Sequence, residues 1–147
     1  MSTRSRVGEA TQLWLLWKRA HEAVRTTVVS HTTVPADVSE PELSVLAWLY
    51  QSEGRSRQSE IAKGLRWDRT RLSHLLTRME KRGYIDRTKE RSGVVVALAA
   101  AGEEMIEAAA PGLEEIAQQR IVDRLGEADA RKLGSLLTRL LDAEAKS

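Results

Sequence analysis

Apolar positions recur every three or four residues along most of the chain, a spacing that is typical of amphipathic helices. The first such segment covers residues 10–29, and a polar stretch over residues 30–37 ends it. The sequence Ser39-Glu40-Pro41-Glu42 is a capping box with proline in the first turn, so it predicts a second helix over residues 40–52. We therefore expect two helices, each with one apolar face, before the middle of the chain.

The middle of the chain predicts two further helices joined by a short turn. An amphipathic segment covers residues 59–65, and residues 66–67 follow it as the turn. Asp68 is a favoured N-cap residue, and the helix that it begins runs to about Arg82 and ends at Gly83. Two helices about three residues apart are the arrangement of a helix-turn-helix.

The hydrophobic pattern changes after this helix. Residues 84–88 alternate weakly, residues 93–98 are rich in β-branched side chains, and the polar residues 89–92 separate them. This pattern predicts a β-hairpin with a charged tip. The expected fold class is therefore mainly α with a small β-hairpin wing, a winged helix-turn-helix.

The C-terminal part of the chain is expected to be helical as well. Residues 99–125 return to helical spacing, and Pro111-Gly112 are expected to kink that helix or split it in two. Gly126 separates a last helix that carries a narrow apolar stripe. The stripe consists of Leu133, Leu136, Leu137, Leu140 and Leu141.

These terminal helices lie outside the compact central lobe that residues 38–98 are expected to form. The 147 residues are most simply one chain unit, and nothing else in it covers the apolar faces of the terminal helices. We therefore expect a homodimer that forms through residues 8–32 and 99–145. The alternative is a monomer in which these helices pack on the central lobe.

Charge is unevenly distributed along the chain, although the net charge is only +2. Residues 55–91 hold twelve basic and five acidic side chains, whereas the remaining residues hold eleven basic and sixteen acidic ones. A basic middle flanked by acidic arms indicates a polyanionic partner. The alternative is a solvated surface that happens to be basic.

The helix expected over residues 68–82 combines an apolar face with an outer face of hydroxyl, imidazole and guanidinium groups. Such groups hydrogen-bond base edges and phosphates, so we expect double-stranded DNA as the partner, with this helix in the major groove. The charged hairpin tip is expected in the neighbouring minor groove, although tip charges also keep edge strands soluble. The candidate DNA-binding residues are Arg57, Ser59, Arg69, Thr70, Arg71, Ser73, His74, Thr77, Arg78, Arg87, Lys89 and Arg91.

Other classes of function find little support in the sequence. There is no cysteine, no nucleophile motif and no glycine-rich phosphate loop, and the three histidines lie in different elements, so we expect neither an enzyme nor a metal or cofactor site. No apolar run is long enough to span a membrane, and the first residues, MSTRSRVGEATQ, lack the apolar part of a secretory signal, so a cytoplasmic protein is expected. Two competing classes remain, a sequence-indifferent architectural DNA-binding protein and a dimeric protein-interaction module.

The order of helices, the segment RLSHLLTRMEKRGYI and the later VVVALAAAGEEM with AAAPG resemble the MarR family of bacterial transcription regulators, over residues 12–141. The resemblance implies a winged helix-turn-helix homodimer that binds palindromic operators, in many members as a repressor relieved by a small aromatic ligand. It places the recognition helix at residues 68–82 and the wing at residues 85–98.

Two positions depart from the pattern of the family. Its wing usually reads Asp-x-Arg where this chain has Glu90 and Ser92, with the arginine one position early, at Arg91. The threonine that caps the helix after the wing is replaced by Ala99, which should cost about 1 kcal/mol at that helix start. The absence of cysteine excludes the thiol-based sensing that some members use.

The aromatic residues suggest a possible ligand site. The chain has four tryptophans and no phenylalanine. Trp14, Trp17 and His21 share one face of the first helix, and Trp48 lies on the second. In proteins similar to this one, effectors bind near such residues, and an aromatic acid would suit a pocket of this kind. The alternative is that these tryptophans serve in core and interface packing.

Overall fold

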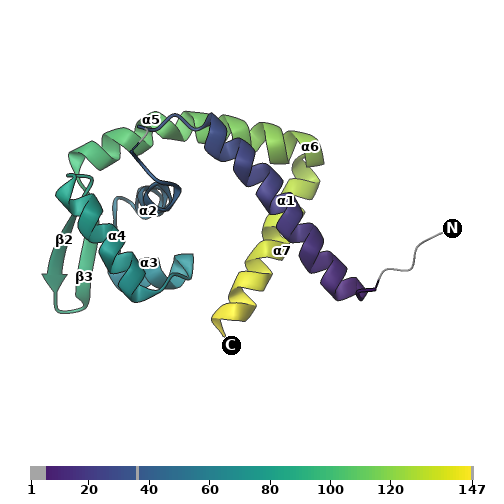
Figure 1. Cartoon of the computed structure of the whole chain (residues 1–147), viewed down its shortest axis with the longest axis horizontal. Coiled ribbons are helices and arrows are strands. Elements are labelled where there is room, and N and C mark those ends of the chain that lie inside the picture. The colour runs from purple at the N-terminus through teal and green to yellow at the C-terminus, as the bar shows by residue number, and fades with distance from the viewer. Residues whose placement is uncertain (1–5, 36, 147) are drawn as a thin grey trace. The chain divides into compact units, whose positions relative to one another are not determined.

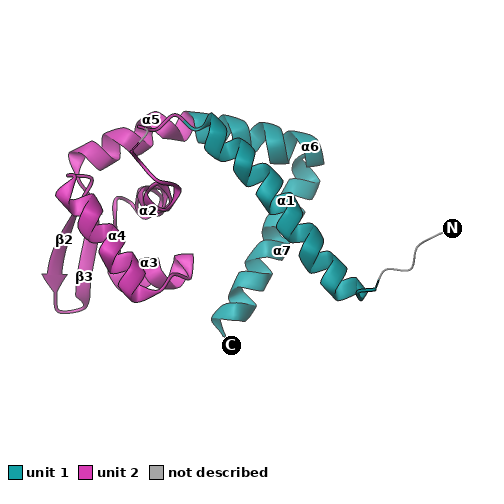
Figure 2. Ribbon diagram, in the orientation of Figure 1, with its two compact units in different colours: residues 1–32, 112–147 teal, residues 33–111 magenta. Residues whose placement is uncertain are grey.

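The computed structural model describes residues 6–35 and 37–146, and the chain divides into two compact units. Unit 1 consists of residues 1–32 and 112–147, and unit 2 consists of residues 33–111 (Figure 2). Ala36, which belongs to the expected loop over residues 30–37, lies outside the described residues, as do the first five residues of the chain.

Unit 1 contains helices and no strand in its described residues (Figure 1). It contains α1 (Glu9–His31), the end of α5 (Ala100–Ala117), the π-helix η1 (Gln118–Val122), α6 (Asp123–Leu125) and α7 (Glu127–Ala145). The expected split at Pro111-Gly112 does not occur, because α5 continues through Pro111. Proline removes one backbone donor, and the flanking residues keep helical geometry without it. No helix among the described residues is long and apolar enough to cross a membrane.

The apolar side chains of unit 1 remain largely exposed. Neither α1 nor α7 contains a buried residue, and Ile116 is the one buried residue among the described residues of this unit. The exposed large apolar residues are Val7, Leu13, Trp14, Leu15, Leu16, Trp17, Val29, Leu125, Leu133, Leu136, Leu140 and Leu141. Such an accumulation is unusual for a surface that stays in water.

Unit 2 begins with the helices that the sequence predicts. They are α2 (Glu40–Gln51), α3 (Gln58–Leu65) and α4 (Arg69–Lys81). The capping box is present, with the Ser39 hydroxyl accepting from the Glu42 N–H at 3.3 Å and the Ser39 N–H donating to the Glu42 carboxylate at 3.2 Å. The Asp68 carboxylate accepts from the Arg71 N–H at 2.9 Å and so caps α4 as expected.

A three-stranded antiparallel sheet completes unit 2. Its strands are β1 (Arg55–Arg57), β2 (Ile85–Glu90) and β3 (Gly93–Leu98), in the order β1-β3-β2. The hairpin of β2 and β3, called the wing below, is closed by two residues rather than the four expected, because residues 89–90 continue β2. The sequence did not predict β1, since three polar residues carry no apolar alternation.

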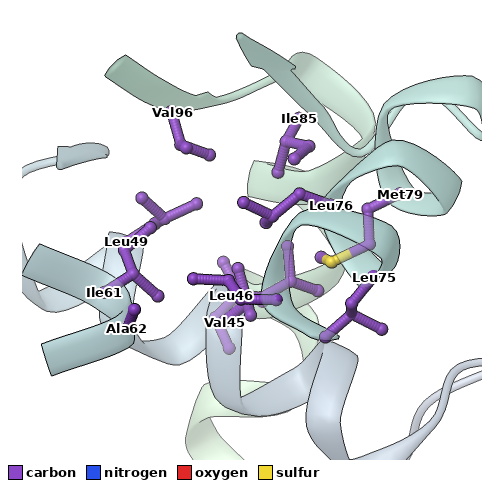
Figure 3. Close-up of a cluster of buried hydrophobic side chains, with 12 residues drawn as sticks. Val45, Leu46, Leu49, Ile61, Ala62, Leu75, Leu76, Met79, Ile85 and Val96 are labelled. Atoms are coloured by element: carbon purple, nitrogen blue, oxygen red, sulfur yellow. The ribbon is translucent and has the colours of Figure 1, made fainter. Parts of the chain in front are cut away.

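The core of unit 2 holds α4 in place. Twelve buried residues from α2, α3, α4, α5 and the wing form one cluster (Figure 3). They are Val45, Leu46, Leu49, Ile61, Ala62, Leu72, Leu75, Leu76, Met79, Ile85, Val96 and Ile106. Gly102 lets the start of α5 approach the backbone carbonyl of Tyr84, because a Cβ at that position would collide with it. α4 is therefore fixed by its apolar face, and its opposite face stays available.

Candidate nucleic-acid interface

The outer face of α4 is polar and exposed. Leu72, Leu75, Leu76 and Met79 are buried, whereas the candidate residues Arg69, Thr70, Arg71, His74 and Arg78 are exposed and Ser73 and Thr77 are half-buried. At 100° per residue, Thr70 and His74 lie opposite the core, with Arg71 and Arg78 along one flank and Arg69 along the other. The helix thus presents hydroxyl, imidazole and guanidinium groups side by side, as the sequence predicts.

The three arginines on the flanks of α4 keep their charge available. Within residues 6–35 and 37–146, Arg69, Arg71 and Arg78 form no ion pair. Their guanidinium groups can therefore pair with phosphates or with guanine edges without first breaking an internal salt bridge.

The start of α3 offers a second place for an anion. Arg57 is the N-cap residue and its side chain makes no capping hydrogen bond, so the N–H groups of the first turn are not capped by that side chain. Arg57 and Ser59 are both exposed here. Backbone N–H groups and the positive end of the helix dipole favour a phosphate at such a position.

Two hollows flank α4. One, of about 670 Å³, is lined by Trp67, Arg71, His74 and Arg78 together with the start of α2. The other, of about 280 Å³, lies between α3, α4 and the wing and is lined by Gln58, Ser59, Arg69 and Ser92 among others. Both bring the candidate residues of α4 together with residues of neighbouring elements in unit 2.

The wing carries two of the candidate residues at its tip. Lys89 and Arg91 are exposed, and the neighbouring Glu90 pairs with Arg55 of β1 at 3.3 Å. Because the side chains of this pair are 62% and 44% exposed, it contributes little to stability. The tip therefore carries two exposed cations beside one neutralised pair.

Arg87 and Thr77 occupy a different environment from the other candidates. Nη2 of Arg87 donates to the Thr77 hydroxyl at 2.8 Å and to the Glu80 carboxylate at 3.2 Å. The Arg87 side chain is only 19% exposed. These contacts could not be predicted from the sequence, since Thr77 and Arg87 lie on different elements and Glu80 has the position of an ordinary surface residue of α4.

A second internal network surrounds Arg82, at the end of α4. Its guanidinium donates to Glu42 at 2.8 Å, to Asp37 at 2.6 Å and to the Tyr84 hydroxyl at 3.2 Å. Burial disfavours the charged guanidinium, but Glu42, Tyr84 and Asp37 outweigh this and raise the pKa of Arg82 above its ordinary value. Sequence reasoning identified Glu42 only as a capping residue and missed this network.

The candidate effector residues fall in both units. In unit 1, Trp14 and Trp17 meet edge to face with ring centroids 5.9 Å apart, and the ammonium of Lys18 lies 5.7 Å from the Trp14 ring. In unit 2, Trp48 packs on Gly64, where any Cβ would collide with the indole ring, and its N–H donates to Ser56 at 3.2 Å. Trp48 therefore has a packing role, and His21 is exposed on α1.

Known proteins match this chain in two ways: a family model matches one segment of unit 2, and solved structures match the fold of nearly the whole chain. A family model described as MarR family matches residues 38–92. This segment is therefore similar to the MarR family. It contains α2, β1, α3, α4 and β2 but not β3, so the MarR-family match coincides with the helix-turn-helix described above. Among curated proteins, none matches the sequence.

Solved structures with the same fold extend over nearly the whole chain. AbsC, a MarR family transcriptional regulator from Streptomyces coelicolor, is 23% identical with a TM-score of 0.81 and covers 99% of this chain and 100% of its own. Sco3205, a MarR family regulator from Streptomyces coelicolor solved in complex with DNA, is 25% identical with a TM-score of 0.76, over 97% and 91% of the two chains.

A third solved structure has a bound ligand. The organohalide-sensing regulator RdhR-CbdbA1625, in its 2,4-dichlorophenol-bound form, is 17% identical with a TM-score of 0.77, over 97% of this chain and 86% of its own. Likeness at this level of identity shows the fold. Together with the family match over residues 38–92, it confirms the predicted winged helix-turn-helix class.

Proposed function

We propose that this protein is a sequence-specific transcriptional repressor that binds a palindromic operator as a homodimer. The observation that carries the proposal is the outer face of α4, where Arg71 and Arg78 are exposed beside Thr70 and His74 and form no ion pair with any residue that the structure describes. Phosphate contacts from such arginines supply affinity, and hydroxyl and imidazole groups add hydrogen bonds to base edges. The DNA-bound structure of Sco3205 supports the choice of duplex DNA as the partner.

The exposed apolar residues of unit 1 support the homodimer. α1 and α7 leave Leu13, Trp17, Leu136 and Leu140 in contact with solvent in a single chain. Burying such side chains against a second copy contributes about 1.5–3 kcal/mol for each one that is fully covered. A twofold dimer places two recognition helices in successive major grooves, which requires a palindromic site.

Relief of repression by a small aromatic ligand is the finer part of the proposal. Trp14 and Trp17 form an aromatic pair with Lys18 and His21 on the same helix, a setting that suits an aromatic acid. The bound 2,4-dichlorophenol in RdhR-CbdbA1625 is consistent with a ligand of this class. If an aromatic acid releases the wild-type protein from DNA, Trp14→Ala should abolish that release. A Trp14→Ala variant that the same acid still releases would place the pocket elsewhere.

Binding to the duplex upstream of the protein's own gene tests the proposal, with a shuffled duplex of equal length as the control. We expect preference for the native duplex and a steep fall of affinity as salt rises. Equal, salt-sensitive binding to both would favour an architectural protein or an operator elsewhere. Binding to neither duplex at low salt would favour a protein-interaction module.

The dimer has a test of its own. Deleting α7 from Glu127 onward removes Leu133, Leu136, Leu140 and Leu141 at once. We expect monomers or insoluble protein, measured by light scattering of the purified chain. A truncated chain that remains a dimer would remove α7 from the interface.

A further inference from the structure

We propose that Thr77, Glu80 and Arg87 form a clip that holds the wing against the recognition helix, and that they position the wing rather than contact DNA. The inference rests on the proposed function, because the wing matters only if the protein binds DNA. It also changes the role that the sequence suggests for Thr77 and Arg87. These three residues are called the wing clip below.

One carboxylate holds Arg87 at two points. Oε1 of Glu80 accepts from the guanidinium of Arg87 at 3.2 Å, and Oε2 accepts from the backbone N–H of the same residue at 3.1 Å. The guanidinium also donates to the Thr77 hydroxyl at 2.8 Å. Three hydrogen bonds therefore join residue 87 of the wing to two positions of α4 that are three residues apart and lie on one side of the helix.

The position of β2 in the sheet explains the need for Glu80. β2 is an edge strand, because the order of the sheet is β1-β3-β2. An edge strand has no neighbour on its outer side to accept its N–H groups. Glu80 supplies the acceptor for Arg87, so α4 takes the place that a further strand would have.

The hydrogen-bonding groups of Thr77 are also used inside the protein. Its hydroxyl donates to the Ser73 carbonyl at 2.9 Å while it accepts from Arg87. Thr77 is half-buried, whereas Thr70 and His74 on the same helix are exposed. A base contact by Thr77 or Arg87 would have to break the wing clip first.

The clip extends the attachment of the wing beyond its base. Ile85 is fully buried and anchors the first residue of β2 in the core. Arg87, two residues along the strand, points to the same face, and the clip holds it to α4. The tip residues Lys89 and Arg91 are therefore carried by a strand whose distance from the recognition helix is set at two points.

Hydrogen exchange of the wing in the protein without DNA is the first test. We expect Glu80→Ala and Arg87→Ala each to speed amide exchange over residues 85–98 about five- to tenfold, as for the loss of one net hydrogen bond. Glu80→Gln keeps one acceptor oxygen and should have a smaller effect. Asp86→Ala is the matched control, since it removes an exposed carboxylate from the same strand. Unchanged exchange in both clip variants would overturn the proposal.

Binding to native and shuffled duplexes is the second test. Arg87 as part of the clip and Arg87 as a direct DNA contact predict opposite effects of Glu80→Ala on DNA binding. For a clip, Glu80→Ala and Arg87→Ala each reduce the preference for the native duplex, and the double variant loses no more than either alone. For a direct phosphate contact, Glu80→Ala binds as well as Asp86→Ala or better, and Arg87→Ala lowers the slope of log affinity against log salt by about 0.9.

The outcomes separate the clip from the proposed function. Loss of preference in both single variants, with faster exchange of the wing, supports the clip. Undiminished binding by Glu80→Ala beside weakened binding by Arg87→Ala overturns it and makes Arg87 a DNA contact. A wild-type protein that binds neither duplex contradicts the proposed function, and the exchange rates of the wing still decide whether the clip orders it.

Discussion

The two units of the chain use their apolar residues in opposite ways. Unit 2 encloses a cluster of twelve buried residues, with Leu46, Leu76 and Ile85 completely covered. Unit 1 leaves Leu13, at 66%, and Leu141, at 59%, as two of its most exposed side chains. Unit 2 therefore covers its large apolar side chains with residues of its own, whereas unit 1 leaves most of its large apolar side chains uncovered.

The same contrast applies to the polar residues. In unit 2 the charged side chains divide into those that pair inside the protein, such as Arg82 with Glu42, and those left exposed on α4, such as Arg71. The internal pairs fix the shape of the unit, and the exposed cations give it a surface for a polyanion. Each of the following predictions tests one side of this division.

The largest difference in the free energy of unfolding is expected between replacing a buried leucine and replacing an exposed one. Leu76→Ala should lower the free energy of unfolding by about 2–5 kcal/mol, because it leaves a cavity in the core of unit 2. Leu141→Ala should act mainly through association, so its effect should be smallest at protein concentrations low enough that both proteins are monomeric. Urea denaturation at two protein concentrations measures both. A concentration-dependent effect of Leu76→Ala would contradict the division between the units.

Glycine substitutions offer a second comparison. Gly64→Ala in α3 should destabilise the protein by about 1–3 kcal/mol, since the new Cβ would collide with the ring of Trp48. Gly134→Ala in α7 meets nothing within 4 Å in the chain and should stabilise its helix by up to about 1 kcal/mol. Thermal unfolding measures both variants. Destabilisation by Gly134→Ala would show that the partner surface packs closely on this position.

The sequence predicted most of the elements because their signals are local. The Ser39 capping box and the Asp68 N-cap fixed two helix starts to the residue, and Gly83 marked the end of α4. β1 was missed, since Arg55–Arg57 pair with β3 through backbone groups that leave no pattern in the side chains. Of the two outcomes expected at Pro111-Gly112, a kink or a split of the helix, the split does not occur, since α5 continues through Pro111.

The candidate site was predicted less completely, for a physical reason. Periodicity separates an outer from an inner face, and it placed Arg71, His74 and Arg78 on the exposed face of α4. It does not show which residues of that face form hydrogen bonds or ion pairs with another element, because such contacts join positions that are distant in the sequence. Arg87 with Glu80 is one example, and Arg82 with Glu42, forty residues away, is another.

The exposed arginines of α4 should matter for DNA and not for folding. Arg71→Ala and Arg78→Ala should each weaken operator binding by about 1–3 kcal/mol where a base is read, with the free energy of unfolding changed by about 0.5 kcal/mol or less. Fluorescence anisotropy with a labelled duplex and urea denaturation measure the two quantities. A double variant that binds DNA as the wild type does would remove α4 from the interface.

The smallest effects are expected at the turn between α2 and β1, which holds a non-glycine residue in the left-handed conformation. Glu53 has φ 58°, and Gly54, next to it, has φ 87°. Side chains disfavour this region, so Glu53→Gly should raise the free energy of unfolding by about 0.5–1 kcal/mol, the relief being partly offset by the greater freedom of glycine in the unfolded chain. Gly54→Ala is the matched opposite: its Cβ meets nothing within 4 Å, yet alanine at positive φ should lower the stability by about 1 kcal/mol. Because the two positions are adjacent and share one environment, opposite signs in urea denaturation would isolate backbone conformation as the cause. Changes of the same sign would show instead that the turn adjusts to either residue, and that unit 2 is less rigid at this edge than its core.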